Sequence, residues 1–366
     1  MKNQIILMAA AALAFASCSK DEMTEVNPGN AIGFRTAVTR ATEVSTSSIH
    51  SMKVTALYTN PSTSDISTYF GSLEFTNTED STSWVSSPTY YWPTSGTMSF
   101  YAWAPSTLAP TISSTSKTFE FTPSTTVADQ IDFIAAVKDG VACSASAGAV
   151  GLPFKHALSE IIIKAKNSNS AYTYKVYGVR IGKVAMSGTY DFAAGSWNTD
   201  RASKDKYAID YAQYPVTLNS GAKSIMDGEG EGATATNLAA MLVPQQTTKW
   251  DKSSANTNGG SYISVNVQIV ATDTGFQVYP ASGTSAWVSV PVAFNWVGGN
   301  RYTYVLDFSN GAGQVDPEEP NNPGSDVLGG AIDFNVTVNT WNPATTEGGM
   351  NDTVTTVNPS TSSSVN

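Results

Sequence analysis

The sequence predicts an all-β protein built of β-sandwiches, and three observations support this fold class. Apolar and polar residues alternate with a period of two in many short segments, and clusters of Gly, Pro, Asn and Ser separate these segments. No long segment shows the 3.6-residue period of an amphipathic helix. Charged residues make up only 14% of the chain, and Ser, Thr, Asn, Gly and Tyr, which suit half-buried strands and turns, take their place.

The predicted strands follow one another along the chain with turn residues between them. Gly298, Gly299 and Asn300 mark one such turn. Many short strands in this arrangement are typical of sandwiches. The segments with clear alternation are 31–38, 52–58, 98–103, 117–121, 131–137, 262–270, 287–294, 301–308 and 331–341.

The length of the chain, 366 residues, allows two domains with separate cores. Small residues around position 148 predict a boundary there, which gives an N-terminal domain over 31–148 and a C-terminal domain over 149–344. The segment 311–330 is rich in Pro and Gly, so we expect a solvated linker without regular structure, followed by a last strand over 331–341. The Ser-, Thr- and Asn-rich residues 345–366 are expected to form a flexible tail.

The N-terminus is predicted to be a signal peptide over residues 1–17. Lys2 supplies the positive charge, and the apolar run of 12 residues over 5–16 is too short to span a bilayer. Small residues immediately before Cys18 resemble a bacterial lipobox, in which the peptidase cuts before the cysteine and the thiol is acylated; Phe15 stands where Leu is usual. We therefore expect Cys18 to carry lipid and to anchor the protein in a membrane.

The residues after Cys18 resemble a lipoprotein export signal. Lys20, Asp21 and Glu22 match the short motif that sends some lipoproteins of Gram-negative bacteria to the outer face of the outer membrane. A polar tether over 18–30 is expected to follow. The second cysteine, Cys143, then has no disulfide partner and is predicted to be a small buried residue.

Composition and motifs argue against catalysis, metals and nucleic acids. The net charge of −10 offers no basic patch for phosphates. His50 and His156 lie far apart and belong to no triad or metal motif, so we expect neither an enzyme nor a cofactor. Four acidic residues of the predicted linker match no calcium-loop spacing, so no metal site is expected there: Asp316, Glu318, Glu319 and Asp326.

Aromatic residues gather between positions 90 and 103. These side chains suit either a sandwich core with cross-strand pairs, which we favour, or a face that contacts a glycan. They are Tyr90, Tyr91, Trp92, Tyr101 and Trp103.

Several segments, in order and spacing from about residue 31 to 341, together resemble the fimbrillin family, the major fimbrial subunits of Gram-negative gut and oral bacteria. They are Ile32-Gly33-Phe34, Thr39-Arg40-Ala41, Tyr90-Tyr91-Trp92-Pro93, the segments 100–105, 132–135, 154–159, 241–245 and 300–304, and the closing strand ending at Trp341. The resemblance implies two transthyretin-like β-sandwich domains, export as a lipoprotein, cleavage by an arginine-specific protease between Arg40 and Ala41, and polymerisation by strand exchange. The tail after Trp341 is longer than we expect of a stalk subunit.

The first and last predicted strands share one pattern, because both begin with Ala-Ile-x-Phe and continue in the same alternation. A one-residue slip would turn every inward side chain of a strand outward, so the register of a strand in its groove matters. Two strands with the same inward pattern in the same register can therefore fill the same groove. We therefore expect cleavage to remove the first strand and the last strand of another fimbrial subunit to replace it. The inward residues are Ile32, Phe34 and Val38 in the first strand and Ile332, Phe334, Val336 and Val338 in the donor strand.

Two functions remain open from these observations. The first is a structural subunit of a fimbria, whose partners are other fimbrial subunits, the outer membrane through the lipid on Cys18, and the protease. The alternative is a monomeric surface adhesin or glycan-binding lipoprotein on the same scaffold.

Overall fold

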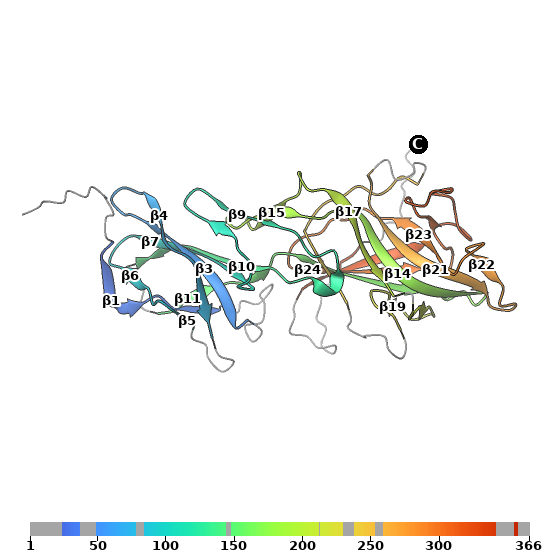
Figure 1. Ribbon diagram of the computed structural model, residues 1–366, viewed down its shortest axis with the longest axis horizontal. Coiled ribbons are helices and arrows are strands. Elements are labelled where there is room, and N and C mark those ends of the chain that lie inside the picture. Colours follow the sequence, from blue (N-terminus) through green and yellow to red (C-terminus); the bar gives the residue numbers. More distant parts are fainter. Residues whose placement is uncertain are drawn as a thin grey trace, which may run out of the picture.

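The protein is an elongated, nearly all-β molecule, which confirms the predicted fold class (Figure 1). This computed structural model describes residues 24–36, 49–77, 84–143, 148–211, 213–229, 238–252, 259–341 and 355–357. The first strands lie at one end of the molecule and the hairpin that contains β22 (Gln277–Tyr279) lies at the other. A short 3₁₀ turn, η2 (Val127–Asp129), accompanies the strands.

The N-terminal half is built on a six-stranded antiparallel sheet with the order β12-β10-β7-β3-β4-β5. Two small sheets, β1-β6 and β11-β2, accompany it. Large apolar side chains pack between them in the N-terminal cluster, which includes Ile32, Phe34, Phe70, Phe75, Trp92, Phe100, Val150, Leu152 and Phe154. The strands are β1 (Val26–Ala31), β2 (Phe34–Thr36), β3 (Ser51–Thr59), β4 (Ile66–Thr76), β5 (Val85–Ser86), β6 (Tyr91–Pro93), β7 (Thr97–Ala104), β10 (Ile134–Ala142), β11 (Val150–Leu152) and β12 (Lys155–His156).

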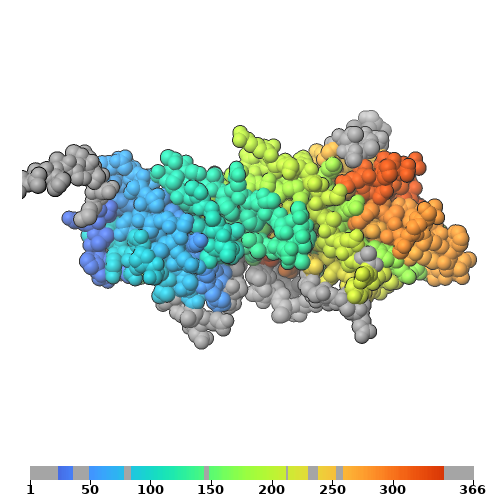
Figure 2. All heavy atoms as spheres, viewed as in Figure 1, coloured from blue at the N-terminus to red at the C-terminus, as the bar shows by residue number. Residues whose placement is uncertain are grey.

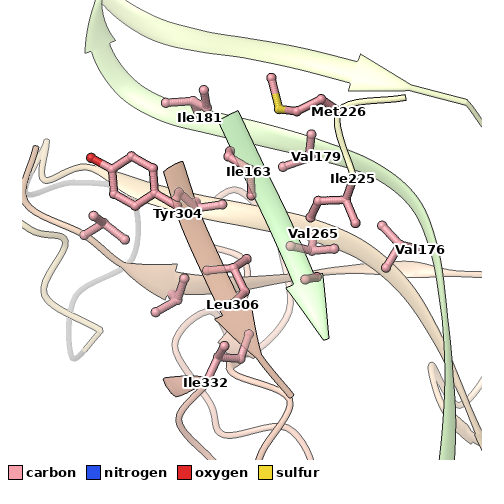
Figure 3. Close-up of a cluster of buried hydrophobic side chains, with 14 of the residues drawn as sticks. Ile163, Val176, Val179, Ile181, Ile225, Met226, Val265, Tyr304, Leu306 and Ile332 are labelled. Carbon is pink, nitrogen blue, oxygen red and sulfur yellow. The ribbon is translucent and has the colours of Figure 1, made fainter. Parts of the chain in front are cut away.

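In the C-terminal half, two larger sheets enclose the C-terminal cluster, part of which Figure 3 shows. One sheet has the order β19-β13-β24-β26-β27, with β20 beside β13, and its central pair β13–β24 is parallel. Its strands are β13 (Ser159–Lys166), β19 (Lys223–Ser224), β20 (Ala240–Leu242), β24 (Asn300–Asp307), β26 (Asp333–Thr340) and β27 (Thr355–Val357). The other has the order β17-β14-β21-β23-β25 and contains β14 (Tyr172–Ala185), β17 (Lys204–Asp210), β18 (Val216–Thr217), β21 (Tyr262–Ala271), β22 (Gln277–Tyr279), β23 (Ala286–Pro291) and β25 (Gln314–Val315).

A further sheet and a third cluster join the two halves. Strand β9 (Lys117–Phe121) pairs with β15 (Gly188–Asp191), and β8 (Thr111–Ile112) and β16 (Ser196–Asn198) complete this four-stranded sheet. The junction cluster beneath it includes Tyr101, Trp103, Phe121, Phe133, Leu158, Phe192 and Trp341. Figure 2 shows a continuous surface across this region. The two halves are therefore joined by main-chain pairing and by shared apolar burial.

Most of the predicted strands are present, with small differences at their ends. The strand expected over 131–137 begins at Ile134, and the one expected over 287–294 ends at Pro291 because proline has no N–H for the ladder. Of the first strand, expected over 31–38, residues 34–36 form β2, and Ala31 is the last residue of the separate strand β1.

Three segments differ from the prediction. The tether expected up to residue 30 contains strand β1, whose ends pair with Pro93 and Tyr91. The tail expected over 345–366 contains strand β27, which pairs with β26. Val150, Leu152 and Phe154 pack in the N-terminal cluster, close to the boundary predicted near 148. The segment 311–330 is folded onto the second C-terminal sheet through β25, so it is not a solvated linker.

Candidate strand-exchange site

The N-terminal segment is held by a short series of main-chain hydrogen bonds. The amide of Ile32 donates to the carbonyl of Tyr90 (2.8 Å), and the amide of Val150 donates to the carbonyl of Gly33 (2.9 Å). Strand β2 then runs parallel to β11, with Phe34 opposite Val150. Within the described residues β11 is the strand partner of β2, so this segment lies at the margin of its half and not within a large sheet.

Two side chains of this segment lie in the N-terminal cluster. Ile32 is 5% exposed and Phe34 is 1% exposed. The Phe34 ring meets Phe75 at 4.8 Å and Phe100 at 5.2 Å between ring centroids, both edge-to-face. Such contacts and the burial of a whole phenyl ring make Phe34 an integral part of the core, although it belongs to a terminal segment.

The last strand, β26, is less deeply buried at its own position. It pairs antiparallel with β24, and Val336 lies opposite Tyr304. Ile332, just before the strand, is 4% exposed, whereas Phe334, Val336 and Val338 are only half-buried against the C-terminal cluster.

A groove of about 960 Å³ lies beside β26, and Phe334 and Val336 are among its lining residues. Val290 and Val305 contribute to its apolar wall, and Lys166 and Lys252 belong to its lining. Both lysines are paired, with Asp307 (2.8 Å) and Asp326 (3.2 Å) respectively. The inward face of β26 is therefore incompletely covered.

The segment 311–330, which we call the strap, packs across the beginning of β26. Its two ends meet, because the amide of Gly313 donates to the carbonyl of Gly330 (2.7 Å) and the amide of Val327 donates to the carbonyl of Gly313 (2.8 Å). Gly313 has a φ of +82°, and a Cβ there would lie 2.8 Å from Cδ1 of Ile332. Only glycine fits this close approach, which buries Ile332.

Acidic side chains fasten the strap to the sheet. Asp316 is fully buried; its carboxylate accepts hydrogen bonds from the Ser264 and Ser289 hydroxyls and from the amide of Glu318. Burial alone would raise the pKa of Glu318, but hydrogen bonds from Lys206 and Tyr262 hold that pKa below its ordinary value. The sequence predicts that these residues are solvated, and the structure shows Asp316 buried. The prediction is wrong because a sequence does not reveal which sheet lies behind a polar loop.

Several predicted site residues lie outside the described residues: Cys18, Lys20, Asp21, Glu22, Val38, Arg40 and Ala41. The others lie in two separate clusters, with Ile32 and Phe34 in the N-terminal half and the donor residues Ile332, Phe334, Val336 and Val338 in the C-terminal half. Within one molecule the structure therefore does not bring the two terminal strands together.

The described residues offer little for catalysis or metal binding. They contain no group of three or more His, Cys, Asp or Glu side chains that could hold a metal ion. Burial raises the pKa of the Cys143 thiol to about 11, which keeps it protonated and unreactive near neutral pH. In the part of the chain that the structure describes, no helix is long and apolar enough to cross a membrane.

The aromatic residues between positions 90 and 103 belong to the core. Trp92, Tyr101 and Trp103 are at most 3% exposed, and Tyr90 and Tyr91 are half-buried. The indole N–H of Trp103 donates to the carbonyl of Leu108 (3.0 Å). This favours the core interpretation over a face that stacks on sugars.

The fold defines an all-β protein, and comparison with known proteins gives its family. A family model described as fimbrillin-like matches residues 39–341, so the chain belongs to the fimbrillin-like family. A fimbrial protein from Bacteroides vulgatus has a similar structure, with a TM-score of 0.51 and 17% sequence identity over 83% of this chain and 98% of that one. A protein from Parabacteroides distasonis described as a "putative cell adhesion protein" gives a TM-score of 0.51 with 10% identity over 86% of this chain and 98% of that one. Among curated proteins, none matches the sequence.

Proposed function

We propose that this protein is a structural subunit of a cell-surface fimbria that polymerises by donor-strand exchange. In this proposal Cys18 carries the lipid of an outer-membrane precursor, Lys20, Asp21 and Glu22 direct its export, and an arginine-specific protease cuts between Arg40 and Ala41. The last strand of another subunit then occupies the place of the removed segment. Membership of the fimbrillin-like family supports the fimbrial role.

The observation that carries the proposal is the difference in burial between the two terminal strands. Phe34 is 1% exposed in the N-terminal cluster, whereas Phe334, which has the matching place in the Ala-Ile-x-Phe pattern, is only half-buried in its own sheet. Withdrawal of Ile32 and Phe34 removes about 3–6 kcal/mol of apolar burial, at roughly 1.5–3 kcal/mol for each side chain. A donor strand that fills the vacated groove recovers that apolar burial. Its own Phe334 also becomes more deeply buried than it is in its own sheet.

The geometry of the exchange favours a filament. Acceptor and donor belong to opposite halves of an elongated molecule, so the contact joins different surfaces of successive subunits. A contact of this head-to-tail kind does not close on itself and extends into a fibre. Main-chain hydrogen bonds along the added strand supply affinity, and the alternating side chains fix its register.

The test is arginine-specific proteolysis of the purified precursor, followed by N-terminal sequencing and size analysis. We expect a new terminus at Ala41 and a ladder of high-mass species, and we expect a variant that lacks residues 331–366 to be cut but to remain monomeric. A ladder that forms equally well without residues 331–366 would refute the last strand as donor. A trimmed monomer from the complete chain would favour the alternative, a monomeric adhesin.

Membrane anchoring is tested separately. Cys18→Ala should release the protein from the membrane fraction or stall its export, because the acyl chains supply the anchoring energy. Wild-type amounts of the variant in that fraction would contradict the lipid anchor.

A further inference from the structure

The end of the last strand is anchored in the junction cluster as well as in its own sheet, where Thr340 pairs with Asn300. Trp341, which follows β26, is 6% exposed and stacks on the His156 ring, with 4.0 Å between ring centroids and an interplanar angle of 14°. Nδ1 of His156 lies 2.6 Å from a carboxylate oxygen of Asp132. We call this contact between His156 and Trp341 the clamp.

Main-chain hydrogen bonds reinforce the clamp through the turn before β24. The amide of Trp341 donates to the carbonyl of Gly299 (2.9 Å), and the amide of Gly299 donates to the carbonyl of Leu158 (2.9 Å). The ring stacking and the main-chain hydrogen bonds therefore both connect Trp341 to residues 156–158.

The clamp is connected to the N-terminal strand by one short segment, residues 150–158, which we call the connecting segment. Its first part is β11, which pairs with β2, and Val150, Leu152 and Phe154 share the N-terminal cluster with Phe34. Its last part carries His156 and Leu158. The segment thus contacts the strand to be removed at one end and the anchor of the donor strand at the other.

The strap is the second anchor of β26, and it is independent of the N-terminal strand. It buries Ile332, and the residues that fasten it, including Ser264, Ser289 and Lys206, all belong to the C-terminal half. Loss of β2 therefore leaves this end of β26 in place, and the clamp is the end that the N-terminal strand can influence.

We propose that the connecting segment couples the two terminal strands, so that withdrawal of β2 loosens the clamp and frees β26 from its Trp341 end. Without β2, strand β11 loses its ladder partner among the described residues, and the cluster that contains Leu152 and Phe154 loses Phe34. The first part of the connecting segment then relaxes while β12 stays paired with β10, and the His156 ring is held less firmly under Trp341. The proposal rests on the proposed function, in which β2 is removed and β26 is donated.

This coupling gives an order to assembly. An uncleaved subunit has a filled groove and a clamped donor strand, so it can neither accept nor donate. A single cut makes both changes in the same molecule. Premature association of precursors is thereby suppressed at both of their exchange surfaces.

The test uses the complete, uncleaved chain and measures amide hydrogen exchange of residues 333–340 by mass spectrometry. Phe34→Ala weakens the packing of β2 without any cleavage, and Phe70→Ala is the matched control, because Phe70 is buried in the same cluster but lies on β4. We expect exchange in residues 333–340 to rise at least tenfold with Phe34→Ala and to remain within about twofold of wild type with Phe70→Ala. Where an alanine variant fails to fold, Phe34→Leu and Phe70→Leu replace the pair.

A double variant shows whether the clamp transmits the effect. Trp341→Ala should raise the exchange of residues 333–340 by itself, and Phe34→Ala should then add less than twofold. Equal acceleration by Phe34→Ala and Phe70→Ala, or full additivity of Phe34→Ala and Trp341→Ala, would overturn the coupling. These measurements need no protease and no polymer, so failure of the coupling is distinct from failure of the proposed function, in which the cleaved chain does not polymerise.

Discussion

Replacing Phe334 with alanine should weaken assembly in addition to destabilising the precursor, because assembly buries this side chain more deeply. Phe334 is half-buried beside an open groove in its own sheet, whereas the place of Phe34 that it would take is 1% exposed and bordered by Phe75 and Phe100. Truncating a fully buried Phe costs about 3–5 kcal/mol, and we expect about half of that, roughly 2 kcal/mol, at the half-buried position.

The difference of about 2 kcal/mol corresponds to about a 30-fold weaker association. Size-exclusion chromatography of cleaved subunits over a range of concentrations measures this weakening of association. It is seen as a rise in the midpoint, the concentration at which half of the protein is polymeric. Phe276→Ala is the control, because Phe276 is 73% exposed on the far hairpin and its truncation should leave that concentration unchanged. An unchanged midpoint for Phe334→Ala would refute the proposed place of this side chain in the acceptor groove.

Three further predictions follow from the same geometry. Val336→Asp should abolish polymers after cleavage, because an unpaired charge buried in the acceptor groove costs several kcal/mol, but the uncleaved chain should stay folded, because water reaches the half-buried home position. The control Asn335→Asp, on the exposed face, should polymerise normally. A size analysis that shows equal amounts of polymer for both variants would contradict this. Cys143, whose pKa is raised to about 11 by burial, should react with a maleimide at pH 8 at least tenfold faster once the N-terminal segment is gone, and an unchanged rate would mean that the cluster does not open there. Glu318 has a folded pKa below its ordinary value of 4.5, so it stabilises the strap above pH 4.5, and this stabilisation is lost as the pH falls through the folded pKa. Proteolysis of the strap should therefore increase over that acidic range. In Glu318→Gln the rate of proteolysis should not change over the same range.

The sequence by itself determined the local features of this protein. Alternation with a period of two is a property of neighbouring residues, so the strands around Val54, Val265 and Tyr304 could be predicted without knowing their partners. The matching Ala-Ile-x-Phe starts of the terminal segments are equally local, and they indicated the two strands on which the proposed exchange depends. Fold class and family resemblance follow from such patterns, because each pattern reports which face of a strand is apolar.

The tertiary structure decided everything that depends on contacts between distant residues. Pairing of β9 with β15, the hydrogen bond from Ser289 to Asp316 of the strap and stacking of Trp341 on His156 each join residues that lie far apart in the chain. Periodicity cannot reveal such partners, because an apolar strand fits many neighbours and a carboxylate has the same local sequence whether solvent or two hydroxyls surround it. The half-burial of Phe334 and the full burial of Phe34 likewise come from how the sheets close around them, and that difference gives the two similar strands their different proposed roles.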